Sequence, residues 1–324
     1  QYTSKSAEVY AESLPYCNMG NLFSMGGAQN RAKIRCLLEY FTAMHDMFPK
    51  IQAEKPYHIQ VIRTLCPAQP TFQAATEKLI GVEIAATGVI EDSANKMIGG
   101  GVLGRGCVQE EIRFVISPEC LLSRIVCEKL QPNEAVIING AEQFADYTGY
   151  ASTFRFEKRT VIPEPTGQER HQSMRNVCIV AMDAVDFHAS NMMATMQYYP
   201  HWVGRETLKA FVSFNGSGMG TLPSSFEGPI CTGNWGCGAF QGDVQMKLLI
   251  QLVAASVVGR PMVYLTFGNE ELVAQFKTLY AQLQAKGVTA GGLYASLVDY
   301  HTKRELVVPE TLVDEDATPS MDEF

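Results

Sequence analysis

The sequence contains no uninterrupted apolar run of the roughly 18 to 20 residues that a membrane-spanning helix needs. Its first residues also lack the basic segment followed by an apolar segment that marks a secretory signal. Nine cysteines are present, but no two of them form a C-x-x-C pair, so the pattern indicates neither a disulfide scaffold nor a zinc ribbon. We therefore expect a soluble protein of the reducing nucleus or cytoplasm, with no membrane contact.

Positive charge is also scarce. The sequence has 26 lysines and arginines against 34 aspartates and glutamates, which gives a net charge of −8 and a pI of about 5.4. A broad nucleic-acid-binding surface normally shows clustered basic residues and a basic pI, so we expect no direct DNA binding. An anionic ligand would have to be attracted by local donors, such as backbone amides and helix N-termini. This requirement directs attention to glycine-rich loops.

Hydrophobic periodicity predicts the fold class. A helix is expected over residues 31–48, where Ile34, Leu37, Leu38 and Phe41 recur at helical spacing and Pro49 should end it. Short apolar runs rich in β-branched residues predict buried strands over residues 58–62, 79–85, 134–138, 177–182 and 262–267. Further helical patterns occupy residues 121–130, 206–214, 244–258, 270–285 and 293–303. This alternation predicts an α/β fold.

Three parts are expected along the chain. A short N-terminal helical region would span residues 1–50, and one large domain would span residues 51–305. At 46% apolar composition the chain can bury a substantial core. Residues 306–324 form an acidic tail that ends in Asp314 to Phe324, where few apolar side chains are available to offset the entropy of ordering. We expect this tail to be disordered.

The first of two glycine-rich loops begins with Gly99, Gly100 and Gly101, and five glycines fall within residues 99–106. Consecutive glycines allow positive φ and remove every Cβ, so the backbone can approach a ligand closely and direct N–H groups at an oxyanion. An isolated triple glycine can equally be an ordinary turn. The acid pair that follows, at residues 110–111, is what favours a functional interpretation.

Glu110 and Glu111 directly precede an apolar run that should place them on regular structure. Glycoside cleavage needs a carboxylic acid to protonate the departing oxygen and a carboxylate to activate water. Adjacent residues do not project from the same face of a helix or strand, so a single catalytic glutamate is the more economical hypothesis. The alternative is a solvated first helical turn whose acids stabilise the helix dipole.

The second loop runs from Gly233 to Asp243 and leads into the helix predicted from residue 244. A glycine loop that feeds a helix N-terminus is suited to a diphosphate. This loop matches neither the Walker A pattern nor a Rossmann fingerprint, so a nucleotide site here would be of another type. The alternative is a tight surface crossover with a packed Trp235.

Together, the triple glycine and the sequence Gln109-Glu110-Glu111 resemble the signature of poly(ADP-ribose) glycohydrolases. The resemblance covers roughly residues 30–305 and includes Asp92-x-Ala94-Asn95-Lys96, Ile112-Arg113-Phe114, Glu142-Gln143-Phe144, Tyr147 to Ala151, Gly233 to Asp243 and Tyr264-x-Thr266-Phe267-Gly268. It implies a macrodomain-like mixed sheet sandwiched by helices, with ADP-ribose bound at its crest. It also implies hydrolysis of the α(1→2) ribosyl-ribose O-glycosidic bond of poly(ADP-ribose) without a metal or other cofactor.

Transferred by position, the resemblance makes Glu111 the general acid and base. Glu110 would hold a ribose hydroxyl beside the scissile bond, and Gln109 would orient the acidic loop. Asp92 and Asn95 match family positions that line the site near the distal ribose. Without the resemblance, Asp92 and Asn95 would be interpreted as a turn and a helix cap.

The nucleotide contacts are assigned in the same way. Tyr150 and Phe267 would flank the adenine, where a flat ring can stack, although in a generic protein both would more often be core residues. The segment from Ala85 to Asp92 is shorter than in typical members, which leaves the family's acidic adenine contact unassigned. Phe240 would shape the ribose pocket. Backbone amides would wrap the diphosphate, those of Asn234, Gly236, Cys237, Gly238, Ala239 and Phe240.

The implied partners are poly(ADP-ribose), its product ADP-ribose and poly(ADP-ribosyl)ated proteins. Three other interpretations stay open. A macrodomain that binds ADP-ribose without cleaving it would tolerate replacement of Glu110 and Glu111. A cysteine hydrolase could use Cys237 with one of six histidines, although none lies at a recognisable spacing. A protein-interaction role could use the helices at 244–258 and 270–285, whose apolar stripes are more simply explained as core-facing.

Overall fold

The computed structural model describes residues 19–53, 58–66, 70–85, 93–160, 166–167, 174–188, 194–216 and 228–305. Asp92 and the acidic tail from residue 306 lie outside the described residues. What the sequence predicts for them therefore stays a prediction. The division of the chain near residue 50 also stays a prediction.

The strands form two main sheets. The first is four-stranded and mixed, in the order β1 (Gln60–Leu65), β4 (Glu134–Asn139), β7 (Cys178–Asp183) and β3 (Ser93–Ala94), with only the β3–β7 pair parallel. The second is three-stranded and parallel, in the order β2 (Val82–Ala85), β9 (Met262–Leu265) and β8 (Ile230–Gly233). A separate antiparallel hairpin pairs β5 (Ala145–Thr148) with β6 (Arg155–Arg159).

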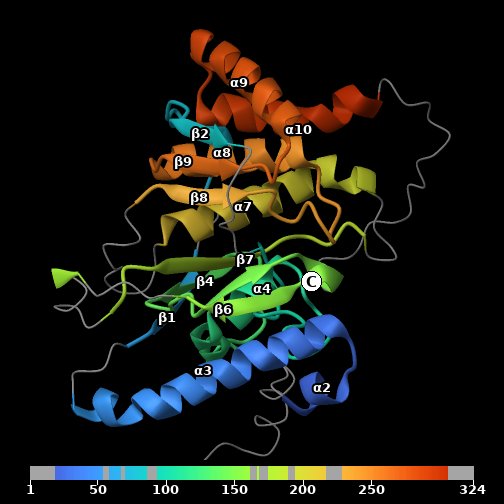
Figure 1. Cartoon of the computed structure of the whole chain (residues 1–324). Helices are drawn as coiled ribbons and strands as arrows, with labels where there is room; N and C mark the ends of the chain where they lie inside the picture. Colours follow the sequence, from blue (N-terminus) through green and yellow to red (C-terminus); the bar gives the residue numbers. More distant parts are fainter. Residues whose placement is uncertain are drawn as a thin grey trace, which may run out of the picture.

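Helices enclose these sheets (Figure 1). Near the middle of the molecule, α7 (Pro200–Asn215) packs on α8 (Val244–Val258) and on strands β4 and β7. On one side, α10 (Ala290–Glu305) covers α8, and α9 (Glu270–Ala285) contacts β2. At the opposite end, α2 (Met19–Ser24) leads to α3 (Ala28–Ala53), which contacts β6 and α4 (Gln109–Ile116). The mixed α/β class with sheets between helices is confirmed.

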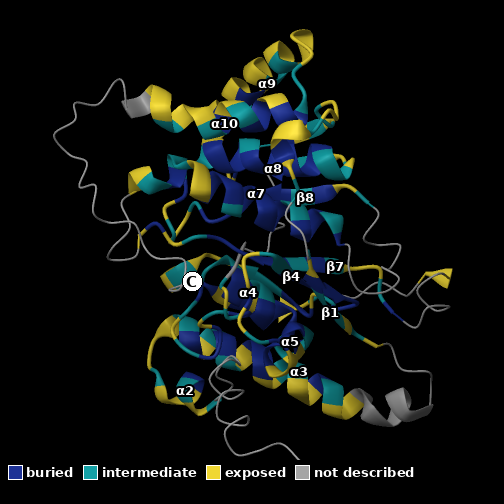
Figure 2. Cartoon of the chain, turned by 180° about the vertical axis from the view of Figure 1, so that it is seen from behind, coloured by how far each residue is buried: buried dark blue, intermediate teal, exposed yellow. Residues whose placement is uncertain are grey.

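The most apolar elements are the most deeply buried. Val136, Ile137 and Ile138 in β4 are fully buried, as are Leu252 and Val253 in α8. Figure 2 shows buried residues gathered in α7, α8 and β4, and exposed residues on the outer sides of α3 and α9. Elements covered on both faces are near-continuously apolar, which is why β4 and α8 were recognisable in the sequence. Among the described helices, none is long and apolar enough to cross a membrane.

The helices predicted over residues 244–258 and 270–285 are confirmed at both ends. Asp243 caps α8 by accepting a hydrogen bond from Met246 N (2.8 Å), and Gly259 ends this helix in the left-handed conformation at φ +76°. Asn269 caps α9 by accepting from Leu272 N (2.9 Å). Side-chain caps and a left-handed glycine are local signals, so the sequence specifies these boundaries by itself.

The other helix predictions are wrong in extent, since α7 begins at Pro200 and α10 at Ala290, before the predicted residues 206 and 293. Helix α3 continues to Ala53, past Pro49. A proline has no N–H and therefore cannot donate one helical hydrogen bond, but this loss does not prevent the following residues from being helical. Leu37 is buried, but Leu38 and Phe41 are 52% and 53% exposed, so only part of the apolar pattern of α3 faces the core.

The helix expected over residues 121–130 is also wrong. A 3-10 helix, η2 (Pro118–Leu122), leads into a single short helix, α5 (Ser123–Val126), and the chain is extended at Cys127. Leu130 N then donates to Lys96 O (2.8 Å), a partner 34 positions away in the sequence, so a long-range contact overrides the local helical pattern. The short strands β3, β5, β6 and β8 were not predicted.

Candidate active site

Glu110 and Glu111 occupy the first turn of α4, and both are buried, at 2% and 7% exposure. The Glu110 carboxylate accepts hydrogen bonds from Asn95 N (2.7 Å) and Gly99 N (2.5 Å). The Glu111 carboxylate accepts from Gly101 N and from Val108 N, both at 2.9 Å. Four backbone amides therefore stabilise two adjacent buried carboxylates.

The two carboxylates converge on Gly100. A Cβ added at this glycine would overlap Glu111 Oε1 and would lie 2.9 Å from Glu110 Oε2. Although adjacent residues leave a helix in different directions, these two lie at its N-terminus, where long side chains can turn back over the preceding loop. Gly100, at φ +44°, thus leaves the space that both acids occupy.

The amides of the triple glycine are bonded within the protein. Gly99 N and Gly101 N donate to the two glutamates, and Gly100 N donates to Met97 O (3.0 Å). The sequence suggested that these amides would meet a ligand oxyanion. In the structure the loop instead holds the acids in place.

Two buried cations that sequence reasoning missed bind the carbonyls of the same loop. Arg124 in α5 donates from Nη1 to Ile98 O (2.7 Å) and Gly100 O (3.0 Å). Lys33 in α3 donates to three further carbonyls of the segment after the triple glycine. The only local signal for Lys33 was its position one helical turn before the buried Cys36 and Leu37.

A cavity of about 500 Å³ adjoins the start of α4. Its walls come from the second glycine loop, from the N-terminal residues of α4 and α8, and from two aromatic residues. Nine of the predicted site residues line it: Gln109, Tyr150, Asn234, Gly236, Cys237, Gly238, Ala239, Phe240 and Phe267. Val108, Ala184 and Val244 complete the lining. The glutamates are not in this lining, but Val108 and Gln109 directly precede them.

The second glycine loop leaves β8 and is anchored by Trp235, which is fully buried and donates from Nε1 to Met182 O (3.1 Å). Gly242 N donates to Gly236 O (2.9 Å), which closes the loop. Within the described part of the chain, the amides of Gly238, Ala239 and Phe240 donate to no protein acceptor. These amides can therefore meet an anion in the cavity. The N-terminus of α8 is itself capped by the Asp243 carboxylate, which leaves the loop amides as the main donors.

Tyr150 and Phe267 are 51% and 47% exposed, which excludes the core role that a generic protein would give them. Phe267 has φ +55°, a conformation that is unfavourable for a bulky residue and that is most often kept at functional sites. The Tyr150 hydroxyl accepts a hydrogen bond from Gln109 N (3.2 Å), so one aromatic wall is tied to the helix that carries the glutamates. Partial burial raises the pKa of Tyr150 above its ordinary value.

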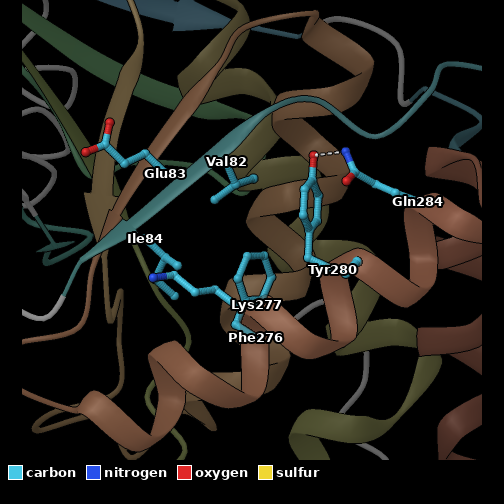
Figure 3. Close-up of a pocket in the computed structure, with 8 residues that line it drawn as sticks. Val82, Glu83, Ile84, Phe276, Lys277, Tyr280 and Gln284 are labelled. Atoms are coloured by element: carbon cyan, nitrogen blue, oxygen red, sulfur yellow. Dashed lines mark hydrogen bonds between the residues drawn. The ribbon is translucent and has the colours of Figure 1, made fainter.

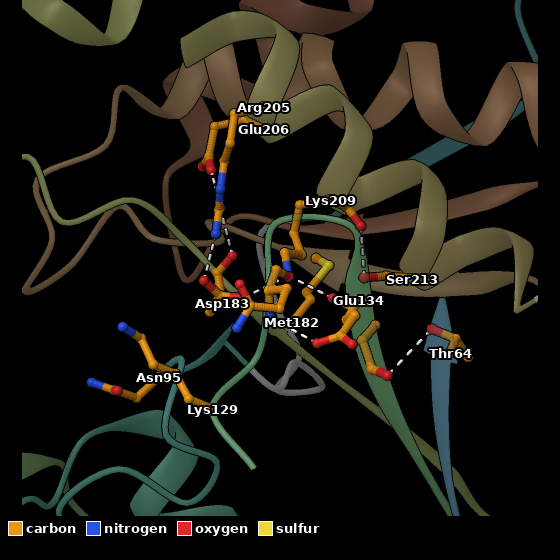
Figure 4. Close-up of polar contacts among 12 residues, drawn as sticks. Thr64, Asn95, Lys129, Glu134, Met182, Asp183, Arg205, Glu206, Lys209 and Ser213 are labelled. Carbon is orange, nitrogen blue, oxygen red and sulfur yellow. Dashed lines mark hydrogen bonds and ion pairs between the residues drawn. The ribbon is translucent and has the colours of Figure 1, made fainter. Parts of the chain in front are cut away.

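A buried ion network joins β7, α7 and α8, and Figure 4 shows its members Asp183, Arg205, Glu206 and Lys209. Asp183, at the end of β7, pairs with Arg205 (2.5 Å) and Lys209 (2.7 Å) of α7. Glu206 pairs with Arg205 and with Lys247 of α8. Burial opposes ionisation of Asp183, but Arg205 and Lys209 outweigh it and lower its pKa. The Lys247 ammonium lies 3.8 Å from the ring centroid of Trp235, a residue of the second glycine loop, so this network helps to hold that loop in place.

Replacing Lys209 by methionine should strongly destabilise the fold. Lys209 is fully buried and also donates to Gln131 O (2.6 Å) and Glu134 O (2.5 Å), so its loss removes one of the two cations paired with Asp183 and two hydrogen bonds to carbonyls. We expect the free energy of unfolding to fall by about 3 to 5 kcal/mol in urea titrations. The control is Lys158→Met, because Lys158 is 75% exposed and lies 3.8 Å from Asp146, where about 0 to 1 kcal/mol is expected. Equal effects of the two substitutions would contradict the prediction.

A second hollow, of about 370 Å³, lies between β2 and α9 (Figure 3). Tyr280 crosses it and donates to Ile80 O (2.5 Å), and Gln284 donates to the Tyr280 hydroxyl (3.0 Å). The residues lining this hollow include no member of the predicted site. Among the described residues there is also no group of three or more histidine, cysteine, aspartate or glutamate side chains arranged to hold a metal, and no histidine lines the cavity beside Cys237.

Comparison with known proteins identifies the family of the chain. A family model described as "Poly (ADP-ribose) glycohydrolase (PARG), Macro domain fold" matches residues 60–274, well over half of the chain. The chain therefore belongs to the poly(ADP-ribose) glycohydrolase catalytic-domain family, which has the macrodomain fold.

Individual relatives carry the same family name. Poly(ADP-ribose) glycohydrolase 1 of Caenorhabditis elegans is 38% identical over 64% of this chain and 26% of its own length. Poly(ADP-ribose) glycohydrolase 2 of the same organism is 35% identical over 63% of this chain and 42% of its own length. Poly(ADP-ribose) glycohydrolase 1 of Arabidopsis thaliana is 28% identical over 91% of this chain and 65% of its own length. The chain thus spans less than two thirds of the length of each of these relatives.

Proposed function

We propose that this chain hydrolyses the α(1→2) ribosyl-ribose O-glycosidic bonds of poly(ADP-ribose) and releases ADP-ribose. The observation that carries the proposal is the position of two buried carboxylates at the start of α4, beside a cavity with free loop amides and two exposed aromatic rings. Family membership and the names of the relatives support the same substrate.

In the proposed mechanism Glu111 acts first as an acid and then as a base. Its carboxylic acid protonates the leaving ribose oxygen, and the resulting carboxylate accepts a proton from the water that attacks the sugar carbon. The transition state has oxocarbenium character, so the negative charge of Glu110, which also converges on Gly100, stabilises it. The carboxylate oxygens of Glu110 retain lone pairs that can accept a ribose hydroxyl as well as the two amides.

The same proposal places ADP-ribose in the cavity. A volume of about 500 Å³ lies within the range of nucleotide-sized sites. The adenine would lie between Tyr150 and Phe267, and the diphosphate would accept hydrogen bonds from the amides of Gly238, Ala239 and Phe240, since the Cys237 amide already donates to Asn234 O (3.0 Å). Asn95, whose amide donates to Glu110, would then lie near the distal ribose.

A second candidate function is an ADP-ribose-binding module without hydrolysis. The observation that favours it is that all four carboxylate oxygens of Glu110 and Glu111 accept backbone amides, which is also what a purely structural pair would do. Either function implies poly(ADP-ribosyl)ated proteins as partners, in the nucleus or cytoplasm. Both functions need the nucleotide cavity, and only the first needs proton transfer by Glu111.

The direct test is incubation with purified poly(ADP-ribose) in buffer without divalent metal, with free ADP-ribose detected by mass spectrometry. We expect ADP-ribose to be released, and we expect EDTA to leave the rate unchanged because Glu111 supplies the proton transfers. Loss of the rate in EDTA and recovery with a divalent ion would overturn the expectation of metal independence. Binding of ADP-ribose without any release from the polymer would favour the binding module.

A further inference from the structure

The Lys33 side chain in α3 is fully buried, and the loop that follows the triple glycine surrounds its ammonium group. Nζ donates to Val102 O (3.0 Å), Gly104 O (2.8 Å) and Gly106 O (2.6 Å). A lysine ammonium has three N–H donors, so all three are used. Because the acceptors are alternate residues of one short segment, the loop is wrapped around a single cation.

Hydrogen bonds lead from this cation to Glu111. Gly106, whose carbonyl binds Lys33, donates from its N atom to Gly101 O (3.0 Å), and Gly101 N donates to Glu111 Oε1 (2.9 Å). Packing here is tight, since a Cβ on Gly106 would lie 2.6 Å from Glu111 Oε1 and 2.8 Å from Gly101 Cα. A shift of Gly106 toward Glu111 or Gly101 therefore displaces the carboxylate or the residue that binds it.

The helix that carries Lys33 is fixed to α4 as well. Cys36, one turn after Lys33, donates from Sγ to Val115 O (3.3 Å), and Cys36 and Leu37 are buried. Helix α3 thus holds both the loop before α4 and α4 itself. The family match begins at residue 60, so this contact comes from outside the matched segment. Burial lowers the pKa of Lys33, while nearby Cys107 and Glu111 act in the opposite direction.

We propose that Lys33 is a positioning residue for the hydrolysis. It fixes the loop from Gly101 to Val108 and, through that loop, the Glu111 carboxylate, so α3 is part of the active site. This inference rests on the proposed function. Lys33 does not line the nucleotide cavity, so its loss should impair the chemical step and leave ligand binding largely intact.

The test is Lys33→Met in the full chain. We expect kcat per folded molecule to fall by about 10- to 100-fold, because a displacement of about 1 Å at a catalytic group has an effect of this size. KM for the polymer and Kd for ADP-ribose should change by less than about threefold. Lys33→Gln retains two N–H donors and should lose less kcat, so it serves if the methionine variant fails to fold.

Two further measurements separate positioning from general destabilisation. Arg260→Met removes another cation that donates to backbone carbonyls, those of Gly228 (2.7 Å) and Phe214 (2.8 Å), and that does not line the cavity, so it should lower stability while kcat per folded molecule stays near wild type. Amide hydrogen exchange at Gly101 and Val108 should be at least about tenfold faster in Lys33→Met, with the loop from Gly236 to Gly242 unchanged. This readout does not depend on catalytic activity.

The outcomes distinguish this inference from the proposed function. If the wild-type chain releases no ADP-ribose, the proposed function fails, and faster exchange at Gly101 and Val108 still shows that Lys33 fixes the loop. Wild-type kcat in Lys33→Met, or unchanged exchange at both amides, overturns the positioning role. A kcat loss of equal size in Arg260→Met would show that the effect belongs to stability, and would overturn it too.

Discussion

Glu111→Gln should abolish turnover of poly(ADP-ribose) and leave ADP-ribose binding nearly unchanged. An amide keeps the shape of the side chain but cannot donate a proton to the leaving oxygen and recover it from water. General acid and base catalysis contributes about 10²- to 10⁴-fold, and one residue here supplies both, so we expect kcat to fall by at least about 10³-fold. Product release measures kcat, and calorimetry measures the ADP-ribose affinity.

The structural cost of this substitution needs its own control. Both Glu111 oxygens accept amides, from Gly101 and Val108, so a glutamine must turn its NH₂ group toward one N–H and lose that hydrogen bond, at about 1 to 3 kcal/mol. Glu119→Gln is the matched variant, because Glu119 also accepts a backbone amide, from Glu142 (2.9 Å), and has no part in the site. Retention of more than about 5% of wild-type activity in Glu111→Gln would exclude Glu111 as the acid and base.

Features that depend on short-range patterns could be predicted from the sequence. The ends of α8 and α9 follow from their capping residues, and the second glycine loop was recognised because it enters a helix directly. The aromatic pair Tyr150 and Phe267 was assigned only through the family resemblance. Their exposure now gives an independent physical reason to place them in a binding site.

Features that depend on distant contacts could not be predicted. Lys33 binds carbonyls 69 to 73 positions later in the chain, and no periodicity in α3 signals such a contact. The triple glycine was recognised, but the sequence predicted that its amides bind a ligand, whereas in the structure it accommodates the two carboxylates. Both roles require the same absence of side chains. Only the direction of the Glu110 and Glu111 side chains distinguishes these two tasks.

Gly100→Ala should lower kcat by about 100-fold or more while weakening ADP-ribose binding only slightly. The new Cβ would overlap Glu111 Oε1 and lie 2.9 Å from Glu110 Oε2, so both carboxylates must move. A displacement of about 1 Å at a catalytic group is sufficient for a 100-fold loss. The backbone at φ +44° also disfavours alanine, at about 1 to 3 kcal/mol of stability. Steady-state kinetics, with urea unfolding as a check on stability, tests this prediction.

Gly238 provides the matched glycine in the other loop. No atom lies within 4 Å of a Cβ built there, and its φ is not positive, so the backbone at Gly238 does not require glycine. Gly238→Ala should therefore change stability by less than about 0.5 kcal/mol. The alanine methyl group enters the space beside the free loop amides, so Gly238→Ala should weaken ADP-ribose binding with little change in kcat. The larger side chain in Gly238→Val should weaken binding further. If Gly238→Val is folded and binds ADP-ribose as tightly as the wild type, the loop from Gly233 to Asp243 does not hold the diphosphate. If Gly100→Ala retains wild-type kcat, the space at Gly100 does not fix the two carboxylates, and Glu111 must be positioned by Val108 and α4 alone.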